Sequence, residues 1–333
     1  MTNLAKFLSA FLRDYLPNER QASTNTCDTY AYTFQLLVNF AAMRLKSTPS
    51  KLTIEHLTVD LVVEFLGYLE GKRKNSVRTR NARAAAIKTF FRFLEYRSVV
   101  FVDQSRRIQA IPTKKTDERL IAHLSQVEME AILDCPDQNT IYGIRDRAML
   151  HLCFAAGLRV SELVSLRMDQ LDQGAVPLIR VIGKGRRERI LPLWKETASD
   201  INSWMAVRPR TNVQEIFINA KGQPMTRSGF KYVLSKYVKM AELTQPSLKK
   251  KTVSPHVLRH TCAILTLRAT HDIRKVSLWL GHADLKSTEI YLRADPNEKL
   301  EVLMARAPLN LRQGKFKAPD KLMAMLKSRD FVQ

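Results

Sequence analysis

The chain has 333 residues, 45% of them hydrophobic, and its 54 Lys and Arg residues outnumber its 32 Asp and Glu residues to give a formal net charge of +22. A charge of this size favours a polyanionic partner, above all a nucleic acid. The length is enough for a sizeable core and fits two domains better than one. No stretch approaches the roughly 20 apolar residues of a membrane span, so we expect a cytoplasmic protein that makes no membrane contact.

Cysteine and glycine patterns argue against several kinds of bound group. Cys27, Cys135, Cys153 and Cys262 show no C-x-x-C spacing, which speaks against a zinc site or a disulfide framework and favours reduced core thiols. None of the 11 glycines forms a G-x-x-x-x-G-K-[ST] or G-x-G-x-x-G loop, so no nucleotide cradle is visible. We therefore expect no metal and no cofactor.

Residues 1–104 are expected to form a helical domain, because apolar residues recur there at helical spacing. The clearest helix is predicted over 76–96. Its apolar stripe comprises Ile87, Phe90, Phe91 and Leu94. Its opposite face carries Arg78, Lys88 and Arg92, which we predict to contact phosphates because neighbouring segments are also basic. A solvated basic face is the alternative.

Residues 105–122 contain Pro112 and a run of charges with little apolar periodicity, which is typical of an interdomain linker. A second domain is expected over 123–305. It begins with an S-x-x-E capping box at Ser125 and Glu128, and a buried helix over 144–156 runs into Gly157. Two β-rich runs around Gly183-Lys184-Gly185 predict a hairpin. The fold is therefore mainly α, with a small β-sheet in the second domain.

Two basic residues of this domain are candidates for binding a phosphate. Arg159 stands between a buried helix and the next helix, where its planar guanidinium group can point into a cleft. Glu162 could orient this group. A purely structural Arg–Glu pair is the alternative. Lys184 stands at the hairpin tip beside Arg186 and Arg187, where a lysine can enter a DNA groove and offer a proton, or simply contact solvent or phosphate.

The strongest local motif is S-P-H-V-L-R-H-T at 254–261. Ser254 as N-cap and Pro255 at the first helical position predict a helix start, which places His256 and Arg259 on one face near the positive end of the helix. Such an arrangement suits a phosphate. The alternative is a histidine satisfied within the core. His260 is left outside the primary set.

A further histidine and a tyrosine follow near the end of this domain. His282 lies in a junction between two helices, nine positions before Tyr291. Taken alone, a tyrosine on a short helix more often packs against the core with its hydroxyl at the rim.

The joint order of these motifs is more specific than any one of them. G-L-R-V-S-E-L, the G-K-G hairpin, H-V-L-R-H-T and L-G-H-x8-Y together resemble the tyrosine recombinases, or phage integrase family, from about Ser125 to Leu300. The local sequences S-L-W-L-G-H and I-Y-L-R-A-D look most like those of integrases carried by transposons and plasmids. Cys262-Ala263-Ile264 departs from the usual continuation after R-H-T, which we expect to affect packing more than chemistry.

The resemblance implies a helical core-binding (SAM-like) domain and an α+β catalytic domain that clamp duplex DNA. It implies that Tyr291 attacks a phosphodiester to give a 3′-phosphotyrosyl link without ATP or metal. Arg159 and Arg259 would hold the nonbridging oxygens. Glu162 would support the site without contacting the phosphate itself. His256 would transfer a proton, His282 would donate a hydrogen bond to the phosphate, and Lys184 would act as the general acid. Arg186 and Arg187 would contact the DNA.

The implied partners are double-stranded DNA with paired recombination sites and a homotetramer assembled on it, together with accessory DNA-bending or partner recombinase proteins. In the tail, 306–333, Leu322, Met323, Met325 and Leu326 predict a short amphipathic helix that docks on a neighbouring subunit; a loosely attached tail is the alternative.

Several other functions compete with a mobile-element integrase. A Xer-type dimer resolvase and a type IB topoisomerase share the chemistry, while a DNA-binding architectural factor would have lost it. All six expected catalytic residues are present, which argues against the architectural factor. An RNA-binding module lacks the aromatic-rich strand motif that base stacking requires.

Overall fold

The computed structural model describes residues 3–116, 121–172, 174, 176–183, 187–282 and 285–294. By its internal contacts the chain divides into two compact units, Met1–Glu118 and Arg119–Gln333. Within the described residues no helix is long and apolar enough to cross a membrane.

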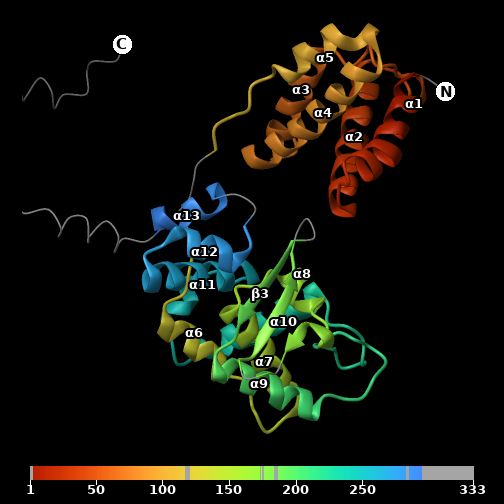
Figure 1. Ribbon diagram of the computed structural model, residues 1–333. Coiled ribbons are helices and arrows are strands. Elements are labelled where there is room, and N and C mark those ends of the chain that lie inside the picture. Colours follow the sequence, from red (N-terminus) through yellow and green to blue (C-terminus); the bar gives the residue numbers. More distant parts are fainter. Residues whose placement is uncertain are drawn as a thin grey trace, which may run out of the picture. The chain divides into compact units, whose positions relative to one another are not determined.

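The first unit is a bundle of helices (Figure 1). Its α-helices are α1 (Asn3–Ala10), α2 (Thr24–Arg44), α3 (Val59–Gly71), α4 (Val77–Arg97) and α5 (Val102–Gln109). A π-helical segment, η1 (Phe11–Glu19), continues α1, and short 3-10 turns occur at η2 (Pro49–Lys51) and η3 (Val99–Phe101). Helices α2, α3 and α4 each start at a hydroxyl side chain, Ser23, Thr58 or Ser76, which accepts a hydrogen bond from a backbone N–H of the first turn.

An aromatic cluster fills the centre of this bundle. The ring of Phe11, which is fully buried, lies 5.3 Å from that of Phe90 and 5.9 Å from that of Phe34. The apolar stripe expected on α4 is confirmed, because Ile87, Phe90, Phe91 and Leu94 are all buried. This packing fixes which side of α4 faces outward.

The expectation of an exposed basic face on α4 holds for Arg78 and Arg92 but not for Lys88. The Lys88 amine donates a hydrogen bond to the carbonyl of Ile111, and burial, with the nearby charge of Arg80, lowers the pKa of Lys88. Lys88 therefore bonds to the unit's own chain. Arg92 keeps an exposed side chain while its Nε donates to Gln109 Oε1 at 3.3 Å.

Residues 105–109, expected to open the interdomain linker, instead form part of helix α5. Ile108 and Ile111 pack into the core of the first unit, so the chain stays attached to this unit beyond residue 104. Further along, Asn81 of α4 donates to the carbonyl of Lys114 at 2.8 Å. Only Ser105 and Ile108 of its eight residues are buried, so the helix has few apolar residues from which the sequence could predict it. Residues 117–120 lie outside the described residues.

The second unit combines helices with a small antiparallel sheet (Figure 1). Its helices are α6 (Gln126–Leu133), α7 (Ile141–Ala155), α8 (Val160–Val164), α9 (Lys195–Val207), α10 (Arg227–Ala241), α11 (Pro255–Thr270), α12 (Ile273–Leu280) and α13 (Lys286–Ala294), with 3-10 turns at η4 (Met168–Gln170) and η6 (Pro246–Lys250). Its strands are β1 (Leu171–Asp172), β2 (Leu178–Ile182) and β3 (Glu188–Pro192), in the order β1-β2-β3.

The expected hairpin is confirmed as the β2–β3 pair, in which Arg180 faces Ile190 and Ile182 faces Glu188. The mainly helical fold with one small sheet is likewise confirmed, and β1 adds a third, short strand. Helix α7 lies in the main core of this unit and packs against α9 and α11. The sheet and these helices hold the segments that carry the candidate site.

Local signals set the helix ends that matter for the site. The capping box is present, with the Ser125 side chain accepting from the Glu128 N–H and Glu128 accepting from the Ser125 N–H. Pro255 starts α11 as expected, but the Ser254 side chain makes no capping hydrogen bond there. Helix α7 ends before Gly157, whose positive φ of 56° is costly for any residue with a Cβ.

Candidate active site

The junction between α7 and α8 positions the first candidate arginine. Gly157 turns the chain in a left-handed conformation, and a Cβ on it would come within 2.6 Å of a methyl carbon of Leu280. Arg159 then occupies the N-cap position of α8, and its backbone N–H donates to Glu162 Oε2 at 3.0 Å. Its Nη1 donates to Glu162 Oε1 at 2.7 Å, so one carboxylate fixes both the backbone and the side chain of Arg159.

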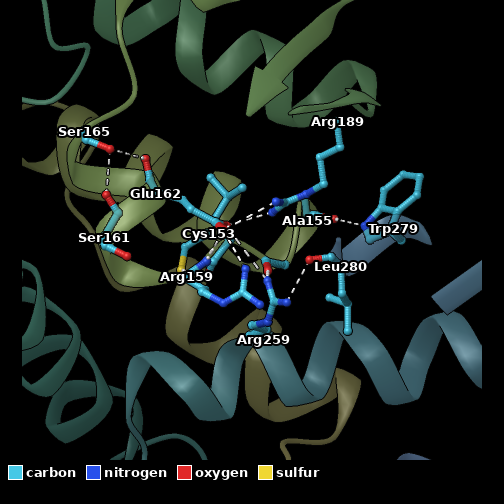
Figure 2. A network of polar contacts seen from close by, with 12 residues as sticks. Cys153, Ala155, Arg159, Ser161, Glu162, Ser165, Arg189, Arg259, Trp279 and Leu280 are labelled. Carbon is cyan, nitrogen blue, oxygen red and sulfur yellow. Dashed lines mark hydrogen bonds and ion pairs between the residues drawn. The ribbon is translucent and has the colours of Figure 1, made fainter. Parts of the chain in front are cut away.

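Glu162 is the centre of a larger ionic cluster. Figure 2 shows the side chains of Arg159, Arg189 and Arg259 converging on it. The Nη2 of Arg189 donates to Glu162 Oε2 at 2.7 Å, and the Nη1 of Arg259 lies 4.0 Å from the same oxygen. Burial alone would raise the pKa of the Glu162 carboxyl, but the hydrogen bonds and charges of Arg189 and Arg159 lower it below its usual value. Glu162 is therefore ionised at neutral pH.

Arg259 is held by the backbone as well as by this carboxylate. Its side chain is nearly buried, and it donates to the carbonyl oxygens of Gly157 at 2.5 Å and Leu280 at 2.8 Å. Burial and the charge of Arg159 lower the pKa of Arg259 to about 10, so it stays protonated at neutral pH. Three guanidinium groups against one carboxylate leave a surplus of positive charge, which suits an anionic ligand such as a phosphate.

Tyr291 lies on α13 with only 1% of its surface exposed, packed with Ala263, Ile264 and Leu280. Its hydroxyl is 3.0 Å from Nδ1 of His260. Burial raises the pKa of Tyr291 to about 12, although the charge of Arg259 acts in the opposite direction. The phenol is therefore protonated at neutral pH.

His282 lies beside the tyrosine in the junction between α12 and α13. Its ring is stacked on that of Tyr291, with the two centres 6.3 Å apart and the planes 11° from parallel. Its Nδ1 is 2.7 Å from the hydroxyl of Thr288, a buried residue of α13. Burial, followed by the charges of Arg259 and Arg159, lowers the pKa of His282 to about 4, so the ring is neutral at neutral pH.

His256 differs from the other candidates because its side chain is exposed on the first turn of α11. Its ring centre lies 6.4 Å from that of His260, one helical turn further along. His256 is thus free to meet a ligand that approaches from solvent.

The structure brings together Arg159, Arg259, Glu162, His282 and Tyr291 in the second unit, with His256 on the same helix as Arg259. Lys184 and Arg186, together with the tail 306–333, lie outside the described residues. Arg187 is exposed at the base of the hairpin loop, where its carbonyl accepts a hydrogen bond from the Gly183 N–H at 2.8 Å. Within the described chain, no group of three or more His, Cys, Asp or Glu side chains is placed to hold a metal ion.

Three contacting residues were not among the site residues predicted from the sequence, and one of them, His260, had been left outside the primary set. Arg189 alternates with Leu191 along β3, which is a signal that its side chain points to the core side of the strand. His260 follows His256 by four positions and therefore shares its helix face. Thr288 precedes Tyr291 by three positions on α13, which places both on one side of that helix. Each signal is local, but none says which distant residue the side chain meets.

Comparisons with known families match both units. Residues 122–298 match the model described as the phage integrase family, and residues 8–98 match the phage integrase N-terminal SAM-like domain.

Individual relatives cover most of the chain. It is 37% identical over 326 residues to the protein named "Putative integrase/recombinase y4rC" of Sinorhizobium fredii, with 98% of each chain covered. It is 32% identical to the tyrosine recombinase XerD of Ralstonia nicotianae, covering 88% of this chain and 91% of the relative. A solved structure of the XerH site-specific recombinase, bound to palindromic difH substrate after cleavage, is similar in fold. Its TM-score is 0.67 at 21% identity, with 89% of this chain and 84% of that chain covered.

Proposed function

Because the chain belongs to the phage integrase family of tyrosine recombinases, which cleave and rejoin DNA through a catalytic tyrosine, we propose that Tyr291 is its nucleophile. The Tyr291 oxygen forms a bond to the phosphorus of a DNA phosphodiester while the bond to the 5′-oxygen breaks. The products are a 3′-phosphotyrosyl link and a free 5′-hydroxyl. Attack by a 5′-hydroxyl from the partner strand reverses the step, so the strands are exchanged without ATP.

The arginine cluster binds the phosphate in this proposal. Arg159 and Arg259 hold the two nonbridging oxygens and stabilise the charge that grows on them in the transition state, each contributing about 3–4 kcal/mol. Glu162 contributes by fixing the direction of both guanidinium groups before DNA arrives. The observation that carries the proposal is this excess of anchored positive charge in the same unit as a buried tyrosine, where the charges of Arg259 and Arg159 act against the rise in the pKa of Tyr291 that burial causes.

Proton movements are assigned to the remaining candidates. The exposed ring of His256 receives the proton of the phenol, directly or through water, and Lys184 donates one to the leaving 5′-oxygen. His282 donates a hydrogen bond to the phosphate through Nε2. Its short contact with Thr288 through Nδ1 supports this assignment, because the other ring nitrogen remains available.

Double-stranded DNA with paired recombination sites is the proposed substrate. Each copy of the chain grips the duplex between the domains 1–104 and 123–305, and four copies assemble on two duplexes so that four strands are cut. Arg78 and Arg92 on α4, with Arg186 and Arg187 at the hairpin, contribute phosphate contacts, which makes affinity fall steeply with salt.

Integration or excision of a mobile element is the role we favour, acting on DNA in the cytoplasm with accessory DNA-bending proteins or a partner recombinase. The 37% identity to an integrase/recombinase over almost the whole chain supports it. Dimer resolution is the second candidate, because the similarity to XerD also covers most of the chain. Recombination between sites in two separate molecules favours the first role, and strict preference for two sites on one circle favours the second.

The tail 306–333 is proposed to dock in an apolar groove on a neighbouring subunit. A groove of about 910 Å³ opens on the second unit between α6, α7 and α11; its apolar lining includes Met129, Leu133, Phe154, Leu265 and Trp279. Glu130, Asp134 and Glu196 line the same groove, and their charge complements that of Lys321 and Lys327, two of the four lysines of the tail. Deletion of residues 315–333 is expected to abolish pairing of two DNA sites; unchanged pairing would exclude docking.

Formation of a covalent adduct tests the proposed chemistry. Wild-type protein, Tyr291→Phe and the control Tyr232→Phe, which changes an exposed tyrosine of the same unit, are incubated with supercoiled DNA from the element's ends without metal or ATP. We expect a protease-sensitive protein–DNA adduct with the wild type and the control but not with Tyr291→Phe. An adduct with Tyr291→Phe would exclude Tyr291 as the nucleophile.

A further inference from the structure

His260 has no part in the proposed chemistry, yet it makes the closest polar contact of the proposed nucleophile. Its Nδ1 lies 3.0 Å from the Tyr291 hydroxyl, and the two ring centres are 5.7 Å apart. The ring of His282 is stacked on the tyrosine ring. With 1% of its surface exposed, Tyr291 cannot reach a phosphate in this arrangement.

The charge around His260 sets the protonation state of its ring. The groups that face its ring are His256 and Arg259 on α11 and Tyr291 on α13. Burial, followed by the charges of His256 and Arg259, lowers the pKa of His260 to about 4. A neutral imidazole carries one ring proton; with that proton on Nε2, Nδ1 accepts a hydrogen bond from the Tyr291 hydroxyl, and this is the tautomer that masking requires.

The same values decide between two roles for His260. The phenol has a pKa of about 12 and the imidazole a pKa of about 4, so His260 is far too weak a base to take the proton of Tyr291 in this arrangement. A neutral acceptor instead favours the protonated phenol, which is the unreactive form. His256, which has an exposed ring, remains the better candidate for proton transfer.

We propose that His260 is a positioning residue that holds the Tyr291 hydroxyl in a masked, hydrogen-bonded position until DNA binding displaces α13. This inference rests on the proposed role of Tyr291 as nucleophile. Thr288, the partner of His282, lies on the same helix. A displacement of α13 therefore releases the tyrosine and frees His282 Nδ1 together, which couples the exposure of the nucleophile to the release of His282 from Thr288.

Two substitutions at His260 separate masking from packing. His260→Phe keeps a ring but removes the acceptor, whereas His260→Asn places an acceptor oxygen close to the position of Nδ1. Adduct formation is measured in a single turnover on a nicked duplex that traps the covalent product, with DNA affinity measured separately. We expect His260→Phe to raise the rate about two- to tenfold, the equivalent of one neutral hydrogen bond, at unchanged Kd, and His260→Asn to return it toward the wild-type rate.

A different outcome overturns the proposal. A rate that falls more than tenfold in His260→Phe at unchanged Kd would place His260 in the chemistry itself, and equal rates in all three proteins would deny it any role. Failure of the proposed function is recognised separately, because adducts would then persist in Tyr291→Phe.

A measurement on the wild-type protein does not depend on how the variants fold. With tyrosine labelled at the ring carbon that bears the hydroxyl, the Tyr291 signal is identified by its loss in Tyr291→Phe. We expect addition of uncut DNA to shift this signal as the bond to His260 breaks. An unchanged signal on a fully bound complex would contradict masking.

Discussion

The arginine cluster and the tyrosine site lie in the same unit but are held in different ways. Arg159, Arg189 and Arg259 meet a buried, ionised carboxylate, and Arg259 also binds two backbone carbonyls. Tyr291 depends on one hydrogen bond to a neutral histidine and on packing of the short helix α13. Charge-assisted bonds to buried partners are worth roughly twice as much as neutral ones.

This difference indicates a division of labour. In the proposed mechanism, the arginine cluster that binds the phosphate is formed before DNA arrives, so little reorganisation is needed in the transition state. The proposed nucleophile is protected, which suits a reaction that stores a DNA break as a covalent bond. A recombinase with an exposed, ionised tyrosine would risk cutting DNA outside an assembled complex.

Removal of the central charge should have the largest effect on the arginine cluster. Glu162→Gln leaves three guanidinium groups without their carboxylate, and loss of one partner of a buried ion pair costs about 3–5 kcal/mol of unfolding free energy. Urea unfolding of the two proteins measures the loss. As a control, Glu196→Gln changes an exposed glutamate and is expected to stay within about 0.5 kcal/mol of wild type. Equal stability of both variants would show that Glu162 does not anchor the cluster.

A smaller effect is expected where the arginine cluster touches the helix end before His282. Gly281 has a φ of 63°, and a Cβ on it would lie 3.0 Å from the side chain of Arg189. Gly281→Ala should cost about 1–3 kcal/mol from the strained backbone, with a further loss from displacing Arg189. The matched control is Gly222→Ala, at φ 71° with a Cβ contact of 3.3 Å to Thr211. Because backbone strain is similar in both, a greater loss of cleavage in Gly281→Ala isolates the contact with Arg189.

The smallest expected effect is on the pH dependence of stability, which differs between the two histidines beside Tyr291 and Glu162 in the arginine cluster. The folded-state pKa values of His260 and His282, about 4, lie below the ordinary value of 6.5. Their contribution to stability is therefore complete above about pH 6.5 and is lost as pH falls through about 4, while that of Glu162 is lost only below its ordinary pKa of 4.5. We expect roughly 1 kcal/mol per histidine, because partial exposure screens both rings.

Urea unfolding between about pH 7.5 and about pH 4.5 measures most of this loss, because the range starts above the histidine window and stops near the ordinary pKa of a glutamate. His282→Asn should flatten the dependence over this range, because it removes one of the two titrating rings. A slope identical to that of the wild type would show that His282 is not kept neutral by folding.

Much of the fold could be predicted because its signals are local. The capping box at Ser125 and Glu128, the left-handed Gly157 and the β2–β3 hairpin each depend on residues close together in the sequence, and all three are present. Arg159 and Arg259 could be singled out for the same reason, since each stands at a recognisable helix start; their chemical roles stay a prediction.

The remaining features depend on contacts between distant segments. The ion pair between Arg189 and Glu162 joins residues 27 positions apart, and the bond between His260 and Tyr291 spans 31 positions. Lys88 was predicted to lie on the exposed basic face of its helix. Its amine instead donates a hydrogen bond to the carbonyl of Ile111, because the chain after α5 returns to α4. Periodicity reports which side of a helix is apolar, but not what covers the polar side.

The most direct test of Tyr291 as the nucleophile is to identify the amino acid linked to DNA. The adduct trapped on a nicked duplex is digested with protease and nuclease, and the remaining nucleotide-bearing peptide is sequenced by mass spectrometry. We expect one modified residue, Tyr291, joined to a 3′-phosphate, with a 5′-hydroxyl on the opposite DNA end. Modification of another residue, such as the exposed Tyr232, or a 5′-phosphate link would contradict it.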